Sequence, residues 1–359
     1  MKVLIQTIDT GGNSVTKTGW YNALMHSGFD VRLWNNARQP AFDIFNEFEP
    51  DVFIGTTYDL NRAVYKNIVK RPNMKVAMWA SDYGPMMEKM DLEKFPVLVA
   101  REDEIDLVGK LKKETGKPDV VFCHYPQSRL DETHGYWKRL GVDYISMMNA
   151  WDALVYQSCA ADLSLEADIS FVGGIWKYKR RTLFPYIFPL LFPIGDYHIK
   201  IYGQTHWNVP QYCGIAGSAQ EKHIFASSQI CPSISEPHSQ VYGWDLIERP
   251  FKVMGNGQSL CISDYVEGFR EFFNVGELPM ANTPETFKDT IDYYLRKENL
   301  EEKDAIILAA QKAVLRDHSY HHRVIDLLSS IGMHKESTKV LEAYLKLLNE
   351  RGQLHLLED

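Results

Sequence analysis

The sequence predicts an α/β protein made of two successive units, each built around a parallel sheet. First, short runs of Val, Ile, Leu and Phe recur without polar alternation, which is typical of parallel strands buried on both faces. Second, stretches with helical periodicity separate these runs. Third, the alternation restarts near Asp168, and 359 residues are too many for one compact core.

In the first unit the sequence DTGGN predicts a glycine turn between the first strand and a helix over 14–27, capped by Ser14 or Asn13. We expect this domain to cover residues 1–160. Its expected strands are residues 2–8, 30–35, 51–57, 75–81, 95–100, 119–124 and 143–149.

In the second unit the strand DISFVGG ends in glycines and leads into the basic segment WKYKRR. We expect this domain to cover residues 161–334 and an amphipathic helix within 335–359 to pack back on the first domain. The expected strands are residues 168–174, 197–203, 230–235 and 259–264, and the expected helices are 218–228, 241–254, 284–297 and 301–316.

The composition predicts a reduced, cytoplasmic protein. Its five cysteines are scattered without a Cys-x-x-Cys pair, and the amino end has no recognisable signal peptide. The apolar stretch Leu183–Gly195 carries three prolines and is shorter than the roughly 20 residues of a membrane span. We interpret it as a kinked, buried helix that could carry an interfacial face. The formal charge of -8 disfavours general attraction to nucleic acid or anionic membrane, although it leaves room for a local basic cleft.

Ligands of parallel α/β sheets bind at the carboxyl ends of the strands, which selects the candidate loops. In the first unit Gly11 and Gly12 let the backbone approach an anion or a sugar, although a plain tight turn explains them equally well. Asp9, Asp82 and His124 also follow expected strands and are candidates for acid/base work, with a helix cap or a loop hydrogen bond as the alternative.

In the second unit Lys177, Lys179, Arg180 and Arg181 follow a strand directly, which suits a diphosphate. The alternative is a solvated helix start, but cations at a helix amino end oppose the helix dipole. Further on, Arg249 and Lys252 lie near one face of an expected helix that ends at Gly255 and Gly257. Gly257 permits the tight turn into the next strand, so a structural role is enough to explain the two glycines. A structural role does not explain why Arg249 and Lys252 stand beside them.

From Asp168 to Val324 the chain resembles the second domain of GT-B-fold glycosyltransferases, specifically the spore-maturation-type group with a family-1-like carboxyl domain. Four blocks occur in the order and spacing of that group: DISFVGG with Arg180 and Arg181, IYG at 201–203, ERPFKVMGNGQSLCISD, and HSYHHR at 318–323. The first half matches only loosely, around NAWD at 149–152. The resemblance implies two Rossmann-like domains that face each other across a cleft.

One departure concerns the donor contacts. Where the family usually carries a Glu, which the resemblance implies would hold the donor ribose hydroxyls, this chain has Lys252. A lysine cannot accept two hydroxyl protons as a carboxylate does. Glu248, one turn earlier, is the residue that could take the ribose role.

The resemblance implies transfer of a sugar from a nucleotide-diphosphate sugar, with a UDP-sugar favoured, to an acceptor hydroxyl of a glycan or small molecule. Arg180 or Arg181, Arg249 and Lys252 would neutralise the leaving diphosphate. Asp9, Asp82 or His124 would serve the acceptor. No Asp-x-Asp pair is present, so we expect no metal and no further cofactor.

Two alternatives remain open. A transferase of the phage or viral type would glycosylate hydroxymethylated bases of DNA, and would need a basic groove on the first domain. A nucleotide-sugar-binding protein without catalysis is the other alternative, because Lys252 replaces a carboxylate.

Overall fold

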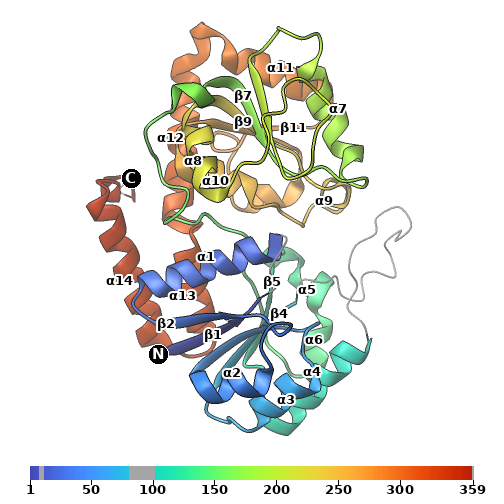
Figure 1. Ribbon diagram of the computed structural model, residues 1–359, viewed down its shortest axis with the longest axis vertical. Helices are drawn as coiled ribbons and strands as arrows, with labels where there is room; N and C mark the ends of the chain where they lie inside the picture. Colours follow the sequence, from blue (N-terminus) through green and yellow to red (C-terminus); the bar gives the residue numbers. More distant parts are fainter. Residues whose placement is uncertain (8–11, 81–101, 358–359) are drawn as a thin grey trace. The chain divides into compact units, whose positions relative to one another are not determined.

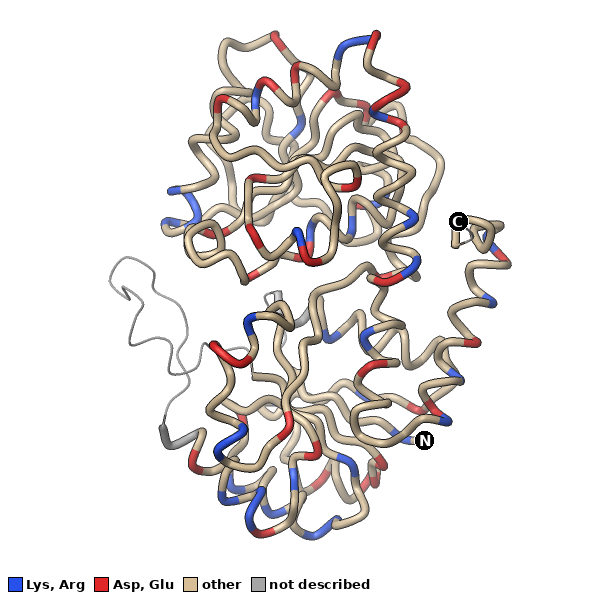
Figure 2. Tube along the Cα trace, turned by 180° about the vertical axis from the view of Figure 1, so that it is seen from behind, with Lys and Arg blue, Asp and Glu red and all other residues tan. Residues whose placement is uncertain are grey.

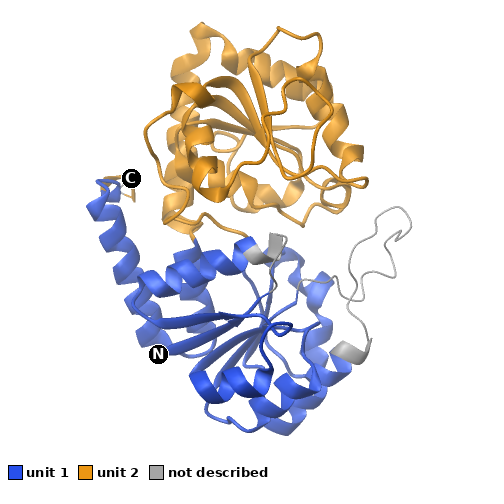
Figure 3. Ribbon diagram, in the orientation of Figure 1, with its two compact units in different colours: residues 1–148, 320–354 blue, residues 149–319, 355–359 orange. Residues whose placement is uncertain are grey.

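A computed structural model of the chain describes residues 1–7, 12–80 and 102–357, with side chains omitted for residues 12–14 and 102–104. The chain forms two compact units, shown in Figure 3. Unit 1 comprises residues 1–148 and 320–354, and unit 2 comprises residues 149–319 and 355–359. The chain therefore returns to unit 1 at Tyr320, earlier than the expected return at residue 335. Of the strands expected in the first half, residues 95–100 lie outside the described part of the chain.

Unit 1 contains a parallel six-stranded sheet with the order β2-β1-β3-β4-β5-β6. Its central strands are buried, as is every residue of Val52–Thr56, so continuous apolar runs form strands here as predicted. The strands are β1 Lys2–Gln6, β2 Asp30–Trp34, β3 Val52–Thr56, β4 Lys75–Trp79, β5 Val120–Cys123 and β6 Tyr144–Ser146. The helices between them are α1 Gly12–His26, α2 Ala41–Phe48, α3 Arg62–Val69, α4 Glu102–Thr115, α5 Leu130–His134 and α6 Tyr136–Arg139, with a short 3₁₀ turn at Gln127–Arg129.

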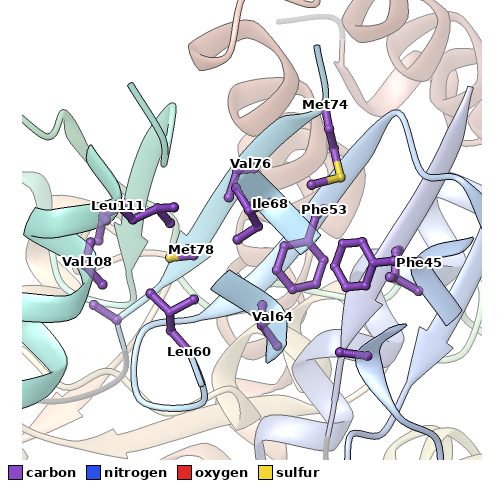
Figure 4. Packing of buried hydrophobic residues seen from close by; sticks show 14 of the residues in the cluster. Phe45, Phe53, Leu60, Val64, Ile68, Met74, Val76, Met78, Val108 and Leu111 are labelled. Atoms are coloured by element: carbon purple, nitrogen blue, oxygen red, sulfur yellow. The ribbon is translucent and has the colours of Figure 1, made fainter. Parts of the chain in front are cut away.

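A hydrophobic cluster lies between the sheet of unit 1 and the helices α2, α3 and α4, and Figure 4 shows its packing. Phe45 of α2 and Phe53 of β3 pack ring against ring, with centroids 5.1 Å apart. The α2 helix reaches this cluster because its buried residues Ala41, Ile44, Phe45 and Phe48 recur at helical spacing.

Two carboxyl-terminal helices complete unit 1: α13 Tyr320–Ser330 and α14 His334–Glu350. Both contact α1 (Figure 1). Gly19 permits the close approach of α1 and α13, because a Cβ at that position would lie 2.2 Å from the Tyr320 ring. A short 3₁₀ turn at Leu354–Leu357 follows α14.

Unit 2 contains a parallel five-stranded sheet with the order β11-β10-β9-β7-β8. With unit 1, it confirms the predicted fold class of two α/β units. The strands are β7 Ala167–Val172, β8 Ile199–Tyr202, β9 Ser228–Ser233, β10 Leu260–Asp264 and β11 Met280–Ala281. The helices are α7 Arg180–Leu191, α8 Ser218–Ala226, α9 Pro237–Tyr242, α10 Arg249–Asn256, α11 Pro284–Leu295 and α12 Leu300–Asp317, and 3₁₀ turns cover Leu163–Leu165, Glu267–Glu271 and Lys297–Asn299.

The single helix expected over 241–254 is wrong, because this stretch contains the end of α9 and most of α10. Gly243 adopts a left-handed conformation with φ 78°, and its N–H bonds to the Ser239 carbonyl, which closes α9. Pro250 then stands in the first turn of α10, where a missing N–H costs nothing. The helix that presents Arg249 therefore begins at Arg249 itself.

Within residues 1–7, 12–80 and 102–357, no helix is both long enough and apolar enough to cross a membrane.

Candidate functional site

The carboxyl edge of the unit 2 sheet collects the residues that the sequence singled out. Gly173 and Gly174 follow β7 at this edge. The helix α10 leads into the parallel strand β10, so its first residue, Arg249, lies at the same edge. This edge is therefore the candidate donor site of the unit.

Arg249 is held under the end of β7. Its Nε donates to the Val172 carbonyl oxygen at 2.7 Å, and its guanidinium lies 4.7 Å from the centre of the Phe171 ring. Burial lowers the pKa of Arg249 from its usual value. Among the described residues, no group hydrogen-bonds the buried Nη1. A buried guanidinium edge without a partner is costly, and an anion would supply the missing acceptor.

Gly173 makes room for this arrangement. A Cβ on residue 173 would lie 2.4 Å from the Arg249 Nη2 atom and 3.0 Å from the Phe171 ring. Gly173 therefore allows the Arg249 guanidinium to lie against the backbone, in addition to allowing the turn after β7.

A second buried cation at this edge is Lys179, the residue just before α7. Its Nζ lies 3.2 Å from the Glu236 Oε1 atom, and the Lys179 side chain is almost entirely buried. Burial, followed by the charge of Arg249, lowers the pKa of Lys179 despite the Glu236 carboxylate. The pair ties the loop after β7 to the segment that leads into α9.

The three other cations of WKYKRR lie differently. Lys177, Arg180 and Arg181 are exposed. Arg180 lies over the Phe184 ring at 5.8 Å, and Arg181 lies over the Tyr178 ring at 5.6 Å. The sequence therefore predicted a basic segment after β7. It did not show that Lys179 is buried while Lys177, Arg180 and Arg181 are exposed.

A hydrogen-bonded relay runs beside the Lys179–Glu236 pair. His238 Nε2 lies 2.7 Å from Asp245 Oδ2, and His238 Nδ1 lies 2.8 Å from the Tyr178 hydroxyl. The same hydroxyl accepts the backbone N–H of His238 at 3.1 Å. One pattern satisfies all three bonds: Nε2–H donates to Asp245, and the Tyr178 O–H donates to Nδ1. Burial is the largest cause that raises the pKa of Tyr178, to about 12, so the phenol keeps its proton.

Lys252 forms a closed cluster of charges one turn into α10. Its Nζ lies 2.9 Å from Glu248 Oε2 and 3.8 Å from Glu221 Oε2, and 4.6 Å from the centre of the Tyr156 ring. Burial alone would lower the pKa of Lys252, but Glu248 and Glu221 outweigh it and hold the pKa above its usual value. The ammonium therefore faces two carboxylates and is already neutralised by them.

Gly257 lies at the other end of α10 from Arg249. It closes the helix with φ 72°, and a Cβ there would lie 2.0 Å from the Gln311 side chain. Its left-handed backbone and close packing assign it a structural role.

The carboxyl edge of the unit 1 sheet was expected to serve the acceptor. Asp9, Asp82 and Gly11 lie outside the described residues, and Gly12 is the first residue of α1. His124 directly follows β5, and its Nδ1 donates to the Met147 carbonyl oxygen at 2.7 Å. Its ring centre lies 4.6 Å from that of Trp79. Because a carbonyl only accepts, this bond puts a proton on Nδ1 and leaves Nε2 as the basic nitrogen of the neutral ring.

Sequence reasoning missed Lys17, which lies beside the same tryptophan. Lys17 of α1 is 1% exposed, and its Nζ is 5.2 Å from the centre of the Trp79 ring. No described residue accepts a hydrogen bond from that Nζ. Burial lowers the pKa of Lys17 to about 8, with Asp59 opposing the shift. The only sequence signal is its helical spacing to the buried Trp20, three residues on.

The histidines of HSYHHR serve packing in the part of the chain that the structure describes. His318 contacts the rings of Phe251, Phe272 and Phe273 in unit 2. His321 lies 3.1 Å from His26, between ring nitrogens, in unit 1. Over the described ranges, no group of three or more His, Cys, Asp or Glu side chains is arranged to hold a metal ion.

Comparisons with known proteins agree with this architecture. Residues 188–329 match a family model described as glycosyl transferase-like. No curated protein sequence matches the chain. Among solved structures, sucrose-phosphate synthase from Thermosynechococcus elongatus is similar with a TM-score of 0.56 and 9% identity, over 99% of this chain and 98% of that one.

Two further solved structures share the fold. HepE of Anabaena, in complex with UDP, has a TM-score of 0.57 and 10% identity, over 92% of this chain and 99% of that one. An alpha-glucosyltransferase in complex with UDP and a 13-mer DNA has a TM-score of 0.59 and 12% identity, with the same coverage. The chain therefore has the GT-B fold of these structures, and its residues 188–329, which lie mainly in unit 2, are similar to the glycosyl transferase-like family.

Proposed function

We propose that the protein transfers a sugar from a nucleotide-diphosphate sugar, with a UDP-sugar favoured, to an acceptor hydroxyl. The observation that carries the proposal is the buried Nη1 atom of Arg249, which has no hydrogen-bond partner among the described residues. It lies at the carboxyl edge of a parallel sheet, where the missing Cβ of Gly173 makes room for the guanidinium.

Arg249 and Lys179 are the buried cations that would stabilise the departing diphosphate. Negative charge on a leaving diphosphate grows in the transition state, so a preorganised cation lowers the barrier more than it tightens ground-state binding. With positive charge supplied by the chain itself, we propose that turnover requires no divalent metal.

Glu248 is the residue that we propose for the donor ribose. The Glu221–Lys252–Glu248 cluster holds two carboxylates for one ammonium. A carboxylate accepts two hydroxyl protons, which a ribose diol offers. Lys252 would then orient Glu248 instead of contacting the diphosphate.

Unit 1 would bind the acceptor and provide the base if the reaction inverts the anomeric centre. His124 is the described candidate, since its Nδ1 bond leaves Nε2 as the proton acceptor. Asp9 and Asp82 remain candidates, with Asp9 placed first because it follows the first strand and precedes Gly11 and Gly12.

Calorimetry with UDP and UDP-glucose tests the donor site. Arg249→Ala should weaken binding by about 1.5–3 kcal/mol, the range for hydrogen bonds to charged groups. Arg249→Lys retains the charge without the fork and should show an intermediate loss, which separates a lost contact from an unfolded site. Arg296→Ala, an exposed arginine that follows α11, is the matched control. Unchanged affinity in both Arg249 variants would reject the site.

A donor-hydrolysis assay tests catalysis. Release of UDP from UDP-sugars by the wild-type chain, persisting with a chelator, supports metal-independent transfer. Tight nucleotide binding without any turnover across several nucleotide sugars would identify a non-catalytic binder instead. Activity that is abolished by the chelator and restored by Mn²⁺ would overturn the metal-free proposal.

A further inference from the structure

The outer face of α7 and the loop behind it form an apolar surface. Residues 182–195, TLFPYIFPLLFPIG, contain no charged side chain. Leu183, Ile187 and Leu190 fill the core of unit 2, as expected of an amphipathic helix. The opposite face should be polar in a surface helix, yet it carries Pro185 and Pro189, both exposed.

Aromatic and aliphatic side chains continue this face beyond the helix. Phe184 and Phe188 are only partly buried and stack with ring centroids 4.2 Å apart. Phe192 is 48% exposed and Ile194 is 64% exposed. Contiguous exposed apolar groups of this kind mark an interaction surface.

Cations border the same surface. Between Asp168 and Asp196 the chain carries four Lys and Arg residues and no Asp or Glu, although its formal charge is -8. Lys179 is paired with Glu236, and Lys177, Arg180 and Arg181 are exposed beside Trp176, which is 47% exposed. Elsewhere, acidic and basic residues are interspersed along the chain (Figure 2). We name Trp176, Lys177, Arg180, Arg181, Phe192 and Ile194 the α7 surface.

We propose that the α7 surface docks on an anionic membrane. Exposed Phe, Ile and Trp beside Lys and Arg is the composition of interfacial helices, in which cations meet lipid phosphates and apolar groups enter the headgroup boundary. The charge selects this occupant over a second copy of the chain, because two copies would bring the cations together. The α7 helix has 12 residues, or about 18 Å at 1.5 Å per residue, too short to span a bilayer. It would lie on the membrane.

The acidic groups around α7 set the strength of this docking. Asp196 follows the surface directly, and Glu285 of α11 acts electrostatically on Tyr186 of α7. These carboxylates oppose an anionic membrane, so the binding should be peripheral and sensitive to salt.

Vesicle co-sedimentation of the full chain tests the proposal. The chain should sediment with vesicles of phosphatidylcholine and phosphatidylglycerol in equal parts, and not with phosphatidylcholine alone, and salt should release it. Arg180→Ala/Arg181→Ala should weaken the association by about 25-fold, since each cation near an anionic surface contributes roughly fivefold. Phe192→Ser/Ile194→Ser should also weaken it.

Two matched variants separate this surface from general effects. Arg296→Ala/Lys297→Ala removes another adjacent, exposed pair of cations from unit 2, and Leu163→Ser removes a side chain that is 84% exposed. Both should bind vesicles like the wild type. Equal binding to both kinds of vesicle, no binding at all, or equal losses in the matched variants would overturn the proposal. So would concentration-dependent dimerisation abolished by Phe192→Ser/Ile194→Ser, which would assign the surface to a second copy.

Discussion

The Arg249 Nη2 atom lies so close to Gly173 that a Cβ on residue 173 would be 2.4 Å from it. The two residues are 76 positions apart in the numbering, and the parallel sheet order β10-β9-β7 brings the end of β7 and the start of α10 to the same edge. Gly173, which directly follows β7, is thus in contact with Arg249, the first residue of α10.

Gly173→Ala should therefore displace the guanidinium while leaving the fold intact, because the far end of a flexible side chain can move. We expect UDP affinity to fall by up to about 3 kcal/mol, the upper end for a hydrogen bond to a charged group. Calorimetry measures the loss. Gly276→Ala is the control, since a Cβ there meets no atom within 4 Å. Equal affinity in the two variants would contradict a role for this contact.

Reversing the charge of Lys252 tests the closed cluster around it. Lys252→Glu would bring a third carboxylate beside Glu248 and Glu221, and we expect a loss of about 3–5 kcal/mol in the free energy of unfolding. The swap Glu248→Lys/Lys252→Glu restores opposite charges and should recover part of the loss in urea unfolding. Lys346→Glu, in an exposed pair with Glu350, should cost less than about 1 kcal/mol. A Lys252→Glu variant as stable as the Lys346→Glu control would contradict a stabilising role for the Glu221–Lys252–Glu248 cluster.

Tyr178→Phe tests the relay between the loop after β7 and α9. The change removes the acceptor of the His238 N–H and the donor to its Nδ1, so we expect about 1–3 kcal/mol of lost stability. The KM for UDP-glucose should also rise, because Lys179 is the next residue. Tyr293→Phe removes another tyrosine hydrogen bond, to the exposed Glu302, and should leave both quantities nearly unchanged. A smaller stability loss in Tyr178→Phe than in Tyr293→Phe would contradict the relay.

The low pKa of Lys17 predicts a pH dependence of stability. Its pKa is about 8 in the folded chain and 10.5 ordinarily, so the folded state binds fewer protons between these values. The contribution of Lys17 to the stability should therefore rise with pH across this window, by about 3 kcal/mol at 1.36 kcal/mol per pKa unit. Lys17→Met removes this contribution, so it should be the more stable protein at pH 7, with an advantage that shrinks as pH rises to 10.5.

Urea unfolding at several pH values measures this difference. Lys339→Met is the control, because Lys339 also lies over a ring, that of Phe29 at 4.6 Å, but is exposed. A difference between wild type and Lys17→Met that stays constant with pH would contradict the low pKa.

Much of the fold was readable locally. Continuous apolar runs predicted β1, β3, β4 and β7. A strand that is buried on both faces is apolar along its whole length, so its own residues are enough to identify it. The basic segment after β7 and the helix end at Gly257 were also predicted, since turn chemistry and charge are visible in neighbouring residues. The break at Gly243 was missed, because residues 241–254 keep helical spacing through it.

What the sequence by itself determined is most of the strands of the two sheets, and it predicts the edge on which ligands would bind. Only the tertiary structure decided which charges are available there. Lys179 is buried against Glu236 while Lys177, Arg180 and Arg181 face water, and Lys252 is neutralised by Glu221, 31 positions earlier in the numbering. The physical reason is that burial and pairing depend on what a crossover brings alongside a side chain, and parallel sheets place residues from distant segments at one edge.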